Sequence, residues 1–243
     1  MAVSYDAYSE LTAEDRQAAS GNAFIQWTHT PSGTPKGILV YVVAGTGQVT
    51  AADNAITSVT YGGVTMTLVD QVHLSGASEP GSVWLYELLS GIPTGAQTVR
   101  ANTSANPTSS TGLFPWFHGF AISMASGGNA LARGAYSTVN SNAVANPSVT
   151  LDPGTGRTGL AILGGWSGKD TEASVTAGTN CTIIDGYDWV ASVGVSRSVR
   201  QTTPATGSFA VAFTATSDEA AMIGATYYES ALRNPMGTMG FFG

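Results

Sequence analysis

Charged residues are scarce in this sequence. Asp, Glu, Lys and Arg account for 10% of its 243 residues, whereas they make up about 25% of an ordinary soluble domain. Only nine residues are basic, none of them in a run, and the net charge is −7. Proteins that bind nucleic-acid phosphates or an anionic membrane surface need clustered Lys and Arg. We therefore expect neither nucleic acid nor a membrane as a partner.

Cysteine and long apolar runs are also missing. Cys181 is the single cysteine, so the chain forms no internal disulfide and needs no oxidising compartment. No apolar run approaches the 18 residues of a membrane-spanning helix. The first residues are acidic and lack the apolar segment of a secretory signal peptide. We expect a protein made in the cytosol.

What the sequence does contain is the pattern of β-strands. Thr, Ser, Gly, Val and Ala are abundant while Lys and Glu are scarce, which excludes a long-helix or coiled-coil protein. Residues 38–43 form a continuous apolar run, typical of a strand covered on both faces. Gly62-Gly63 predicts a hairpin turn. Residues 6–18 have the only helical pattern, and because they are polar nearly all round we expect a mobile arm or a surface helix there.

Four features of the first half recur in the same order in the second half, which predicts an internal duplication. The matched segments are 27–31 leading to Gly37 with 149–153 leading to Gly159, Ser58-Val-Thr with Ser174-Val-Thr, 66–70 with 181–185, and Thr94-Gly95 with Thr206-Gly207.

The predicted fold is all-β, with two related antiparallel β-sandwich units of jelly-roll or immunoglobulin-like type in tandem. A merger of the two units into one larger jelly roll is the alternative. The boundary between the units falls in the small, polar stretch 127–146. The predicted division is 1–22 as an N-terminal arm, 23–130 and 131–232 as the two units, and 233–243 as an apolar C-terminal tail.

No recognisable catalytic or metal-binding pattern is present. His29, His73 and His118 lack the spacing of ligands or of a catalytic set, so we interpret them as surface or satisfied histidines. The dinucleotide-like G-x-G-x-x-G match at 154–159 precedes an apolar strand instead of a helix. Asp185 and Asp188 on a predicted turn could hold Ca²⁺, and a solvated turn explains them equally well. We expect no enzyme activity, no metal and no cofactor.

Aromatic residues and the C-terminus are the candidates for a binding face. Phe114, Trp116, Phe117 and Phe120 cluster before a strand, and Trp166, Tyr187 and Trp189 lie in the second half. Such residues fill a core, anchor a protein interface or stack on sugars. The tail carries four large apolar side chains spaced by glycines. The predicted interface residues are Met236, Met239, Phe241, Phe242, Trp116 and Phe117.

Three stretches resemble β-sandwich proteins of tailed bacteriophages and related prophage elements. They are WTHTPSGTPKGILV at 27–40, SVTYGGVTMT at 58–67 and GIPTGAQTV at 91–99. The resemblance implies a non-enzymatic virion structural protein, and a head decoration or cement protein is the leading interpretation. It would bind copies of itself as a homo-oligomer and other capsid proteins, and it would be located in the virion. The alternative is a carbohydrate-binding module of a tail or cell-surface protein.

Overall fold

The computed structural model describes residues 3–12, 15–16, 24–45, 56–74, 81–103, 116–168, 174–188, 194–216 and 218–230. These residues form strands and turns and contain no helix, so none that could cross a lipid bilayer. The first half contains β1 (Ser4–Glu10), β2 (Asp15–Arg16), β3 (Phe24–His29), β4 (Gly37–Gly45), β5 (Ile56–Tyr61), β6 (Val64–Thr65), β7 (Thr67–His73), β8 (Gly81–Leu88), β9 (Gln97–Thr103) and β10 (Trp116–Ala125). The second half contains β11 (Leu131–Val144), β12 (Ser148–Leu151), β13 (Thr158–Gly168), β14 (Thr176–Ala177), β15 (Cys181–Asp188), β16 (Gly194–Gln201), β17 (Ala205–Thr206), β18 (Phe209–Thr214) and β19 (Asp218–Glu229).

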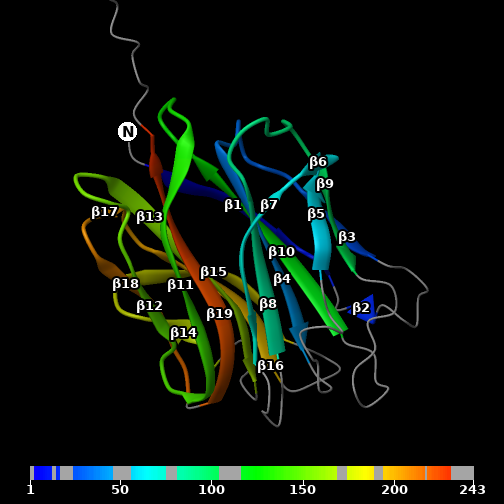
Figure 1. The fold of residues 1–243 in the computed structure, drawn as a ribbon, viewed down its shortest axis with the longest axis vertical. Coiled ribbons are helices and arrows are strands. Elements are labelled where there is room, and N and C mark those ends of the chain that lie inside the picture. The colour runs from blue at the N-terminus through cyan, green and yellow to red at the C-terminus, as the bar shows by residue number, and fades with distance from the viewer. Residues whose placement is uncertain are drawn as a thin grey trace, which may run out of the picture.

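The strands form four layers of antiparallel sheet (Figure 1). The first inner sheet has the order β1-β10-β4-β8-β7 and faces the first outer sheet, β3-β9-β5-β6. The second inner sheet has the order β11-β19-β13-β16-β15 and faces the second outer sheet, β12-β18-β14. The two inner sheets pack against each other, so two sandwich units lie back to back. The predicted all-β fold with two related sandwich units is confirmed.

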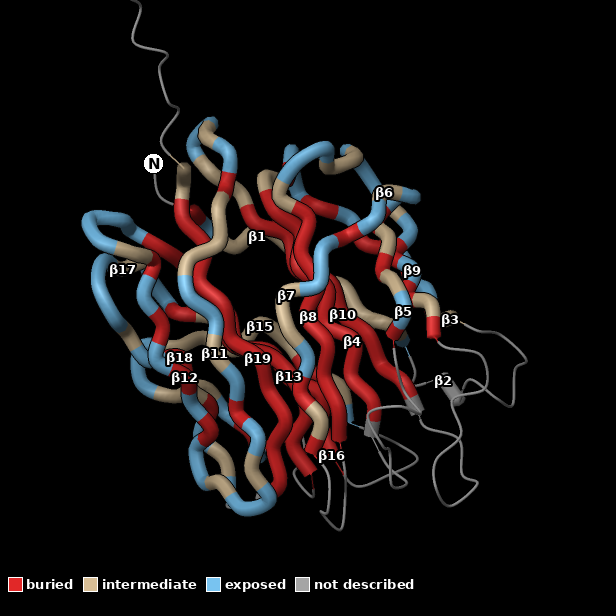
Figure 2. Tube along the Cα trace, in the orientation of Figure 1, coloured by how far each residue is buried: buried red, intermediate tan, exposed pale blue. Residues whose placement is uncertain are grey.

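A hydrophobic core fills each space between neighbouring sheets. One core lies inside each unit, and the central core lies between the inner sheets. Strands β4, β8 and β13 are consequently buried on both faces, as Figure 2 shows for the middle of the molecule. This double burial explains the continuous apolar run at 38–43. Large members of the central core are Leu39, Tyr41, Leu85, Phe120, Leu160, Ile162, Trp166 and Tyr227.

The sheet order confirms the duplication. Strands β1, β10, β4, β8 and β7 of the first inner sheet occupy the positions of β11, β19, β13, β16 and β15 in the second. One row of paired residues crosses the first inner sheet through Thr67, Glu87, Leu39, Ile122 and Tyr8. The corresponding row crosses the second through Thr182, Arg200, Ile162, Ala225 and Tyr136.

A β-bulge recurs at the same place in both units. The pairing register shifts between Leu68 and Asp70 in β7, and between Ile183 and Asp185 in β15. In each bulge the aspartate Oδ1 accepts a hydrogen bond from the N–H of the next residue, at 2.8 Å for Asp70 and 2.9 Å for Asp185. The matched segments 66–70 and 181–185 therefore share a local structure as well as a pattern.

One of the matches is shifted by a residue. The sequence alignment through Gly37 and Gly159 places Leu39 opposite Ala161, whereas the paired rows place Leu39 opposite Ile162. Leu39 and Ile162 both face the central core, while Ala161 faces the second outer sheet. The connection before β13 is one residue longer than its counterpart. Because side chains alternate along a strand, that single residue reverses the face of every side chain in a gapless alignment.

The local prediction for the first residues of the first unit is wrong. Residues 4–10 form an edge strand paired with β10 and not a helix or a separate arm. Asp6 and Ser9 are accommodated there because Asp6 Oδ2 accepts a hydrogen bond from Ser123 Oγ at 2.7 Å and Ser9 Oγ lies 2.7 Å from His29 Nδ1. The connection 126–130 separates β10 of the first unit from β11 of the second and overlaps the stretch 127–146 predicted as the boundary. The rest of that stretch is mostly β11, an edge strand that tolerates polar residues because one side of it meets solvent.

The two units are related like the subunits of a symmetric dimer. Strand β7 of the first unit lies beside β11 of the second, and on the opposite side β1 and β10 of the first lie against β16 and β15 of the second. Near the centre, Tyr41 packs against Gly164, which occupies the equivalent position in the other unit. A Cβ at Gly164 would lie 3.0 Å from Cε1 of Tyr41. The Tyr41 hydroxyl donates a hydrogen bond to the Ile223 carbonyl at 3.1 Å across the central core.

We predict that Gly81→Ala destabilises the protein by about 1–3 kcal/mol, because small-to-large changes in a packed core force side chains out of place. A Cβ at Gly81 would overlap the buried indole of Trp166 on the opposite inner sheet. Gly33→Ala is the control, since nothing lies within 4 Å of the added atom. Denaturant unfolding measures both variants. Equal stability of the two would contradict the packing of the inner sheets against each other.

Candidate functional site

The two sides of the central core are built differently. We call the side between β1 and β15 the closed seam. There Tyr8 packs on Phe120 with ring centroids 5.8 Å apart, and His118 stacks on Tyr187 at 4.5 Å with an interplanar angle of 12°. The Arg200 guanidinium lies 5.3 Å from the centre of the Tyr5 ring. Aromatic side chains from both units therefore cover this side.

The opposite side, between β7 and β11, is the open seam, and a polar cluster joins the units at one end of it. Glu87 of β8 is 9% exposed. Its Oε1 accepts a hydrogen bond from Arg133 Nη1 of β11 at 3.0 Å, and its Oε2 accepts one from the Tyr227 hydroxyl of β19 at 3.0 Å. Both carboxylate oxygens thus have a partner in the other unit.

Electrostatics hold this cluster in one protonation pattern. Burial raises the pKa of the Glu87 carboxyl, and the Arg133 guanidinium and the Tyr227 hydroxyl oppose that rise. Burial and the neighbouring Glu87 carboxylate raise the pKa of Tyr227 well above its usual range. The phenol therefore stays protonated and remains a hydrogen-bond donor. One carboxylate engaged by two fixed partners suits a structural tie better than acid–base chemistry.

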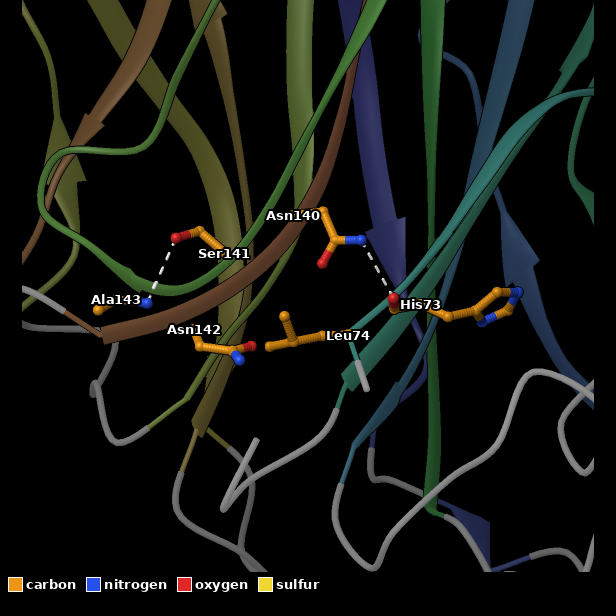
Figure 3. A pocket seen from close by; sticks show the side chains of 6 residues that line it. All are labelled: His73, Leu74, Asn140, Ser141, Asn142 and Ala143. Carbon is orange, nitrogen blue, oxygen red and sulfur yellow. Dashed lines mark hydrogen bonds between the residues drawn. The ribbon is translucent and has the colours of Figure 1, made fainter. Parts of the chain in front are cut away.

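Further along the open seam, Tyr136 of β11 is 47% exposed, with the Arg133 guanidinium 5.4 Å from its ring centre. The seam ends in a hollow of about 500 Å³ lined by His73, Leu74, Asn140, Ser141, Asn142 and Ala143 (Figure 3). Asn140 Nδ2 donates to the His73 carbonyl at 3.2 Å, and the His73 imidazole points away from the hollow. The open seam therefore combines an exposed aromatic ring with a hollow that has small and polar walls.

The histidines lie on three different strands. His29 on β3 and His118 on β10 are buried, and His118 Nε2 lies 3.0 Å from the Leu11 carbonyl. His73 contacts Ser82 Oγ through Nδ1 at 3.0 Å and packs edge-on against Trp84. Within the described part of the chain, no group of three or more His, Cys, Asp or Glu side chains could hold a metal ion.

The contact between Ser9 and His29 superficially resembles a nucleophile and its base. Its geometry does not suit that chemistry. Burial lowers the pKa of His29 to about 4, although nearby Asp6 acts in the opposite direction, so the imidazole is a weak base. Its Nε2 is buried without a hydrogen-bond partner, and the Tyr61 ring packs edge-on at 5.9 Å. We interpret this contact as a tie between β1 and β3.

Most of the aromatic residues singled out in the sequence lie in cores. Phe117 is fully buried, and its ring centroid lies 6.5 Å from that of Trp84. Phe120 and Trp166 belong to the central core. Trp116 begins β10, and its side chain lies outside the described residues. Phe114 and Trp189 also lie outside them, as do the four predicted interface residues of the C-terminal tail, Met236, Met239, Phe241 and Phe242.

The predicted Ca²⁺ turn and the single cysteine both lie in the second unit. Asp185 and Asp188 lie within strand β15, so the predicted turn for Ca²⁺ is wrong at this position. Asp185 Oδ1 accepts a hydrogen bond from Gly186 N within the bulge at 2.9 Å. Cys181, the single cysteine of the sequence, is partly buried against the core of the second unit.

Sequence reasoning missed the residues of the open seam, Glu87, Arg133, Tyr136 and Tyr227. A signal for Glu87 was present, because it is a lone carboxylate in the apolar strand Gly81–Leu88. A buried carboxylate requires a partner. No comparable signal marks Arg133 or Tyr136, since both lie in the polar stretch 127–146.

A scan against models of known protein families finds no match for this chain, and a search of curated proteins finds none either.

We predict that Tyr227→Phe lowers the free energy of unfolding by about 1.5–3 kcal/mol, the usual contribution of a hydrogen bond to a charged group. The change removes the hydroxyl that donates a hydrogen bond to Glu87 Oε2 across the central core. Tyr136→Phe, at an exposed ring, is the control and should leave stability within about 0.5 kcal/mol. If both variants unfold alike, the Glu87 cluster does not tie the units together.

We also predict that His29 makes the stability of the folded protein sensitive to acid. Its pKa is about 4 in the folded protein and 6.5 in the unfolded chain. The unfolded chain therefore binds the proton first as pH falls, and stability is lost between pH 6.5 and 4, by at most about 3 kcal/mol. The free energy of unfolding, measured across this pH range, should decrease less steeply with falling pH in His29→Gln than in the unaltered chain. Parallel curves for the two proteins would refute the assignment.

Proposed function

We propose that this protein is a non-enzymatic structural protein of a tailed-bacteriophage virion, and specifically a head decoration or cement protein that acts as a homo-oligomer. The resemblance of residues 27–40, 58–67 and 91–99 to phage β-sandwich proteins supports this proposal. The virion is the proposed location, after synthesis in the host cytoplasm.

The observation that carries the proposal is the central core. It fuses two sandwich units back to back and leaves the inner sheets no face for a ligand. Among the described residues, Glu87 and His29 are polar groups that enter the interior and tie units or strands together. A stiff slab without an arranged reaction site suits a part that reinforces an assembly.

The outer faces fit contact with other proteins. Exposed positions of the outer sheets carry mostly short polar or small side chains, Gln26, Thr28, Thr57 and Thr98 on the first and Ser148, Thr150, Ala210 and Thr214 on the second. Such faces can meet a partner without a large cost for removing water from charges.

The edges of the inner sheets are protected against strand addition. Each pairing that involves an edge strand, β1, β7, β11 or β15, contains a register shift. The described pairings among the inner strands of these sheets contain none. Bulges at sheet edges oppose edge-to-edge association. Assembly in the proposed role would therefore use the outer faces and the terminal segments, including the apolar tail.

The test is binding to capsids from which the native protein has been stripped. We expect saturable binding of the purified chain to such capsids and no binding on a glycan array. A control with the capsids of an unrelated phage should show no binding. Glycan binding without capsid binding would overturn the proposal in favour of a carbohydrate-binding module. Absence of the chain from purified virions by mass spectrometry would also overturn it.

A further inference from the structure

The duplicated fold allows the two seams to be compared position by position. Tyr8 and Tyr136 are equivalent residues at the ends of the matched rows. Tyr8 is half-buried on Phe120 in the closed seam, whereas Tyr136 is 47% exposed in the open seam. Among the described residues, Leu68 and Tyr136 are the large hydrophobic side chains that reach such exposure.

These two exposed residues face different parts of the molecule. Leu68 pairs with Tyr86, which belongs to the core of the first unit, so Leu68 points away from the open seam. Tyr136 pairs with Ala225 of the central core and points into the seam. The open seam thus has an uncovered aromatic ring where its counterpart has a packed one, and the hollow of about 500 Å³ lies further along β11, at Asn140. The walls of the hollow are mostly polar, and Leu74 is the large apolar side chain among them.

The C-terminal segment supplies the matching chemistry. Residues 231–243 follow directly on Ser230 and contain Met236, Met239, Phe241 and Phe242 spaced by glycines. Thirteen extended residues reach at most about 45 Å. The 14-residue strand β11, which borders the seam, has a similar length of about 48 Å. An extended tail can therefore contact Tyr136 and the hollow at the same time.

The place where the tail leaves the sheet favours a neighbouring copy. Ser230 N donates to the Ala130 carbonyl at 2.9 Å. The turn at 126–130 is fastened over the end of β19, because Glu229 accepts hydrogen bonds from Gly127 N at 2.7 Å and Asn129 Nδ2 at 3.1 Å. To enter the seam of its own chain, the tail would have to cross this fixed turn and the start of β11.

We infer that the open seam, lined by Tyr136, Leu74 and residues 140–143, is the docking groove for the C-terminal segment of a second copy of this chain. The inference rests on the proposed role as an assembly subunit. Met and Phe side chains of the tail cover the Tyr136 ring and enter the hollow. The contact joins two different surfaces, so it can repeat from copy to copy, and it forms a ring where the rotation between copies closes.

The test uses disulfide cross-linking in a full-length Cys181→Ser background. One variant carries Tyr136→Cys and another carries Met239→Cys. When the two are mixed and oxidised, only a contact between copies can link them. We expect at least tenfold more linked heterodimer than in a matched mixture of Thr150→Cys with Met239→Cys. Thr150 is exposed on the second outer sheet, away from the seam.

A chain carrying both Tyr136→Cys and Met239→Cys distinguishes the other arrangements. Linked dimers and larger species support the proposal. A disulfide within single chains shows that the tail covers its own seam and overturns it. Linkage no greater than in the Thr150→Cys control also overturns it. Intact binding to stripped capsids in these last two cases would leave the proposed function standing while excluding this groove.

A measurement without added cysteines checks the same contact. Tyr136→Ala should weaken self-association by at least tenfold while the unfolding midpoint stays within a degree or two. Leu68→Ala is the matched control, because Leu68 is 43% exposed and points away from the seam. Equal self-association of Tyr136→Ala and the unaltered chain would overturn the proposal, as would a chain that stays monomeric at all concentrations tested.

Discussion

The structure depends on the burial of two sheets against each other. Each inner sheet is covered on one face by the outer sheet of its own unit and on the other face by the inner sheet of the other unit. Burying a large apolar side chain contributes roughly 1.5–3 kcal/mol, and the central core gathers such residues from both halves of the chain. Polar atoms that enter this core need partners, and the Tyr41 and Tyr227 hydroxyls find theirs in the other unit. Neither unit is therefore complete without the other.

Covalent fusion of the two units allows equivalent positions to differ. In a dimer of identical subunits, a residue near the symmetry axis meets its own copy. Here Tyr41 packs against Gly164, so one tyrosine side chain fills a space that is too small for two. Glu87 and Arg200 are likewise equivalent, yet Glu87 binds Arg133 and Tyr227 while Arg200 lies over Tyr5. These differences close one seam with aromatic rings and leave the other with a hollow.

The same constraint limits how the protein can meet a partner. Inner faces are committed to the cores, and bulges interrupt the register at the inner-sheet edges. The outer faces, the open seam and the terminal segments remain. A subunit that contacts its neighbours through such surfaces keeps its own fold unchanged during assembly, which is the behaviour expected of a part that reinforces a preformed shell.

The sequence by itself determined the strand character, the duplication and the hairpin at Gly62-Gly63, where positive φ angles of 55° and 82° favour glycine. These features depend on periodicity and on backbone geometry, which are local. It did not determine that β1 is a strand, because the pairing of residues 4–10 with β10 supplies hydrogen bonds that no local pattern records. It also placed Leu39 opposite Ala161, since a gapless alignment cannot reveal which face a strand presents to a second sheet.

The open seam was decided by tertiary structure alone. Glu87, Arg133, Tyr136 and Tyr227 come from three strands in two units, and their types and spacing have no meaning until the inner sheets pack. Phe117, which the sequence predicts as an interface residue, lies in the core of the first unit because the first outer sheet covers that face of β10. Composition and periodicity fix which side chains can be buried, but only the packing of one sheet on another decides which of them remain at the surface.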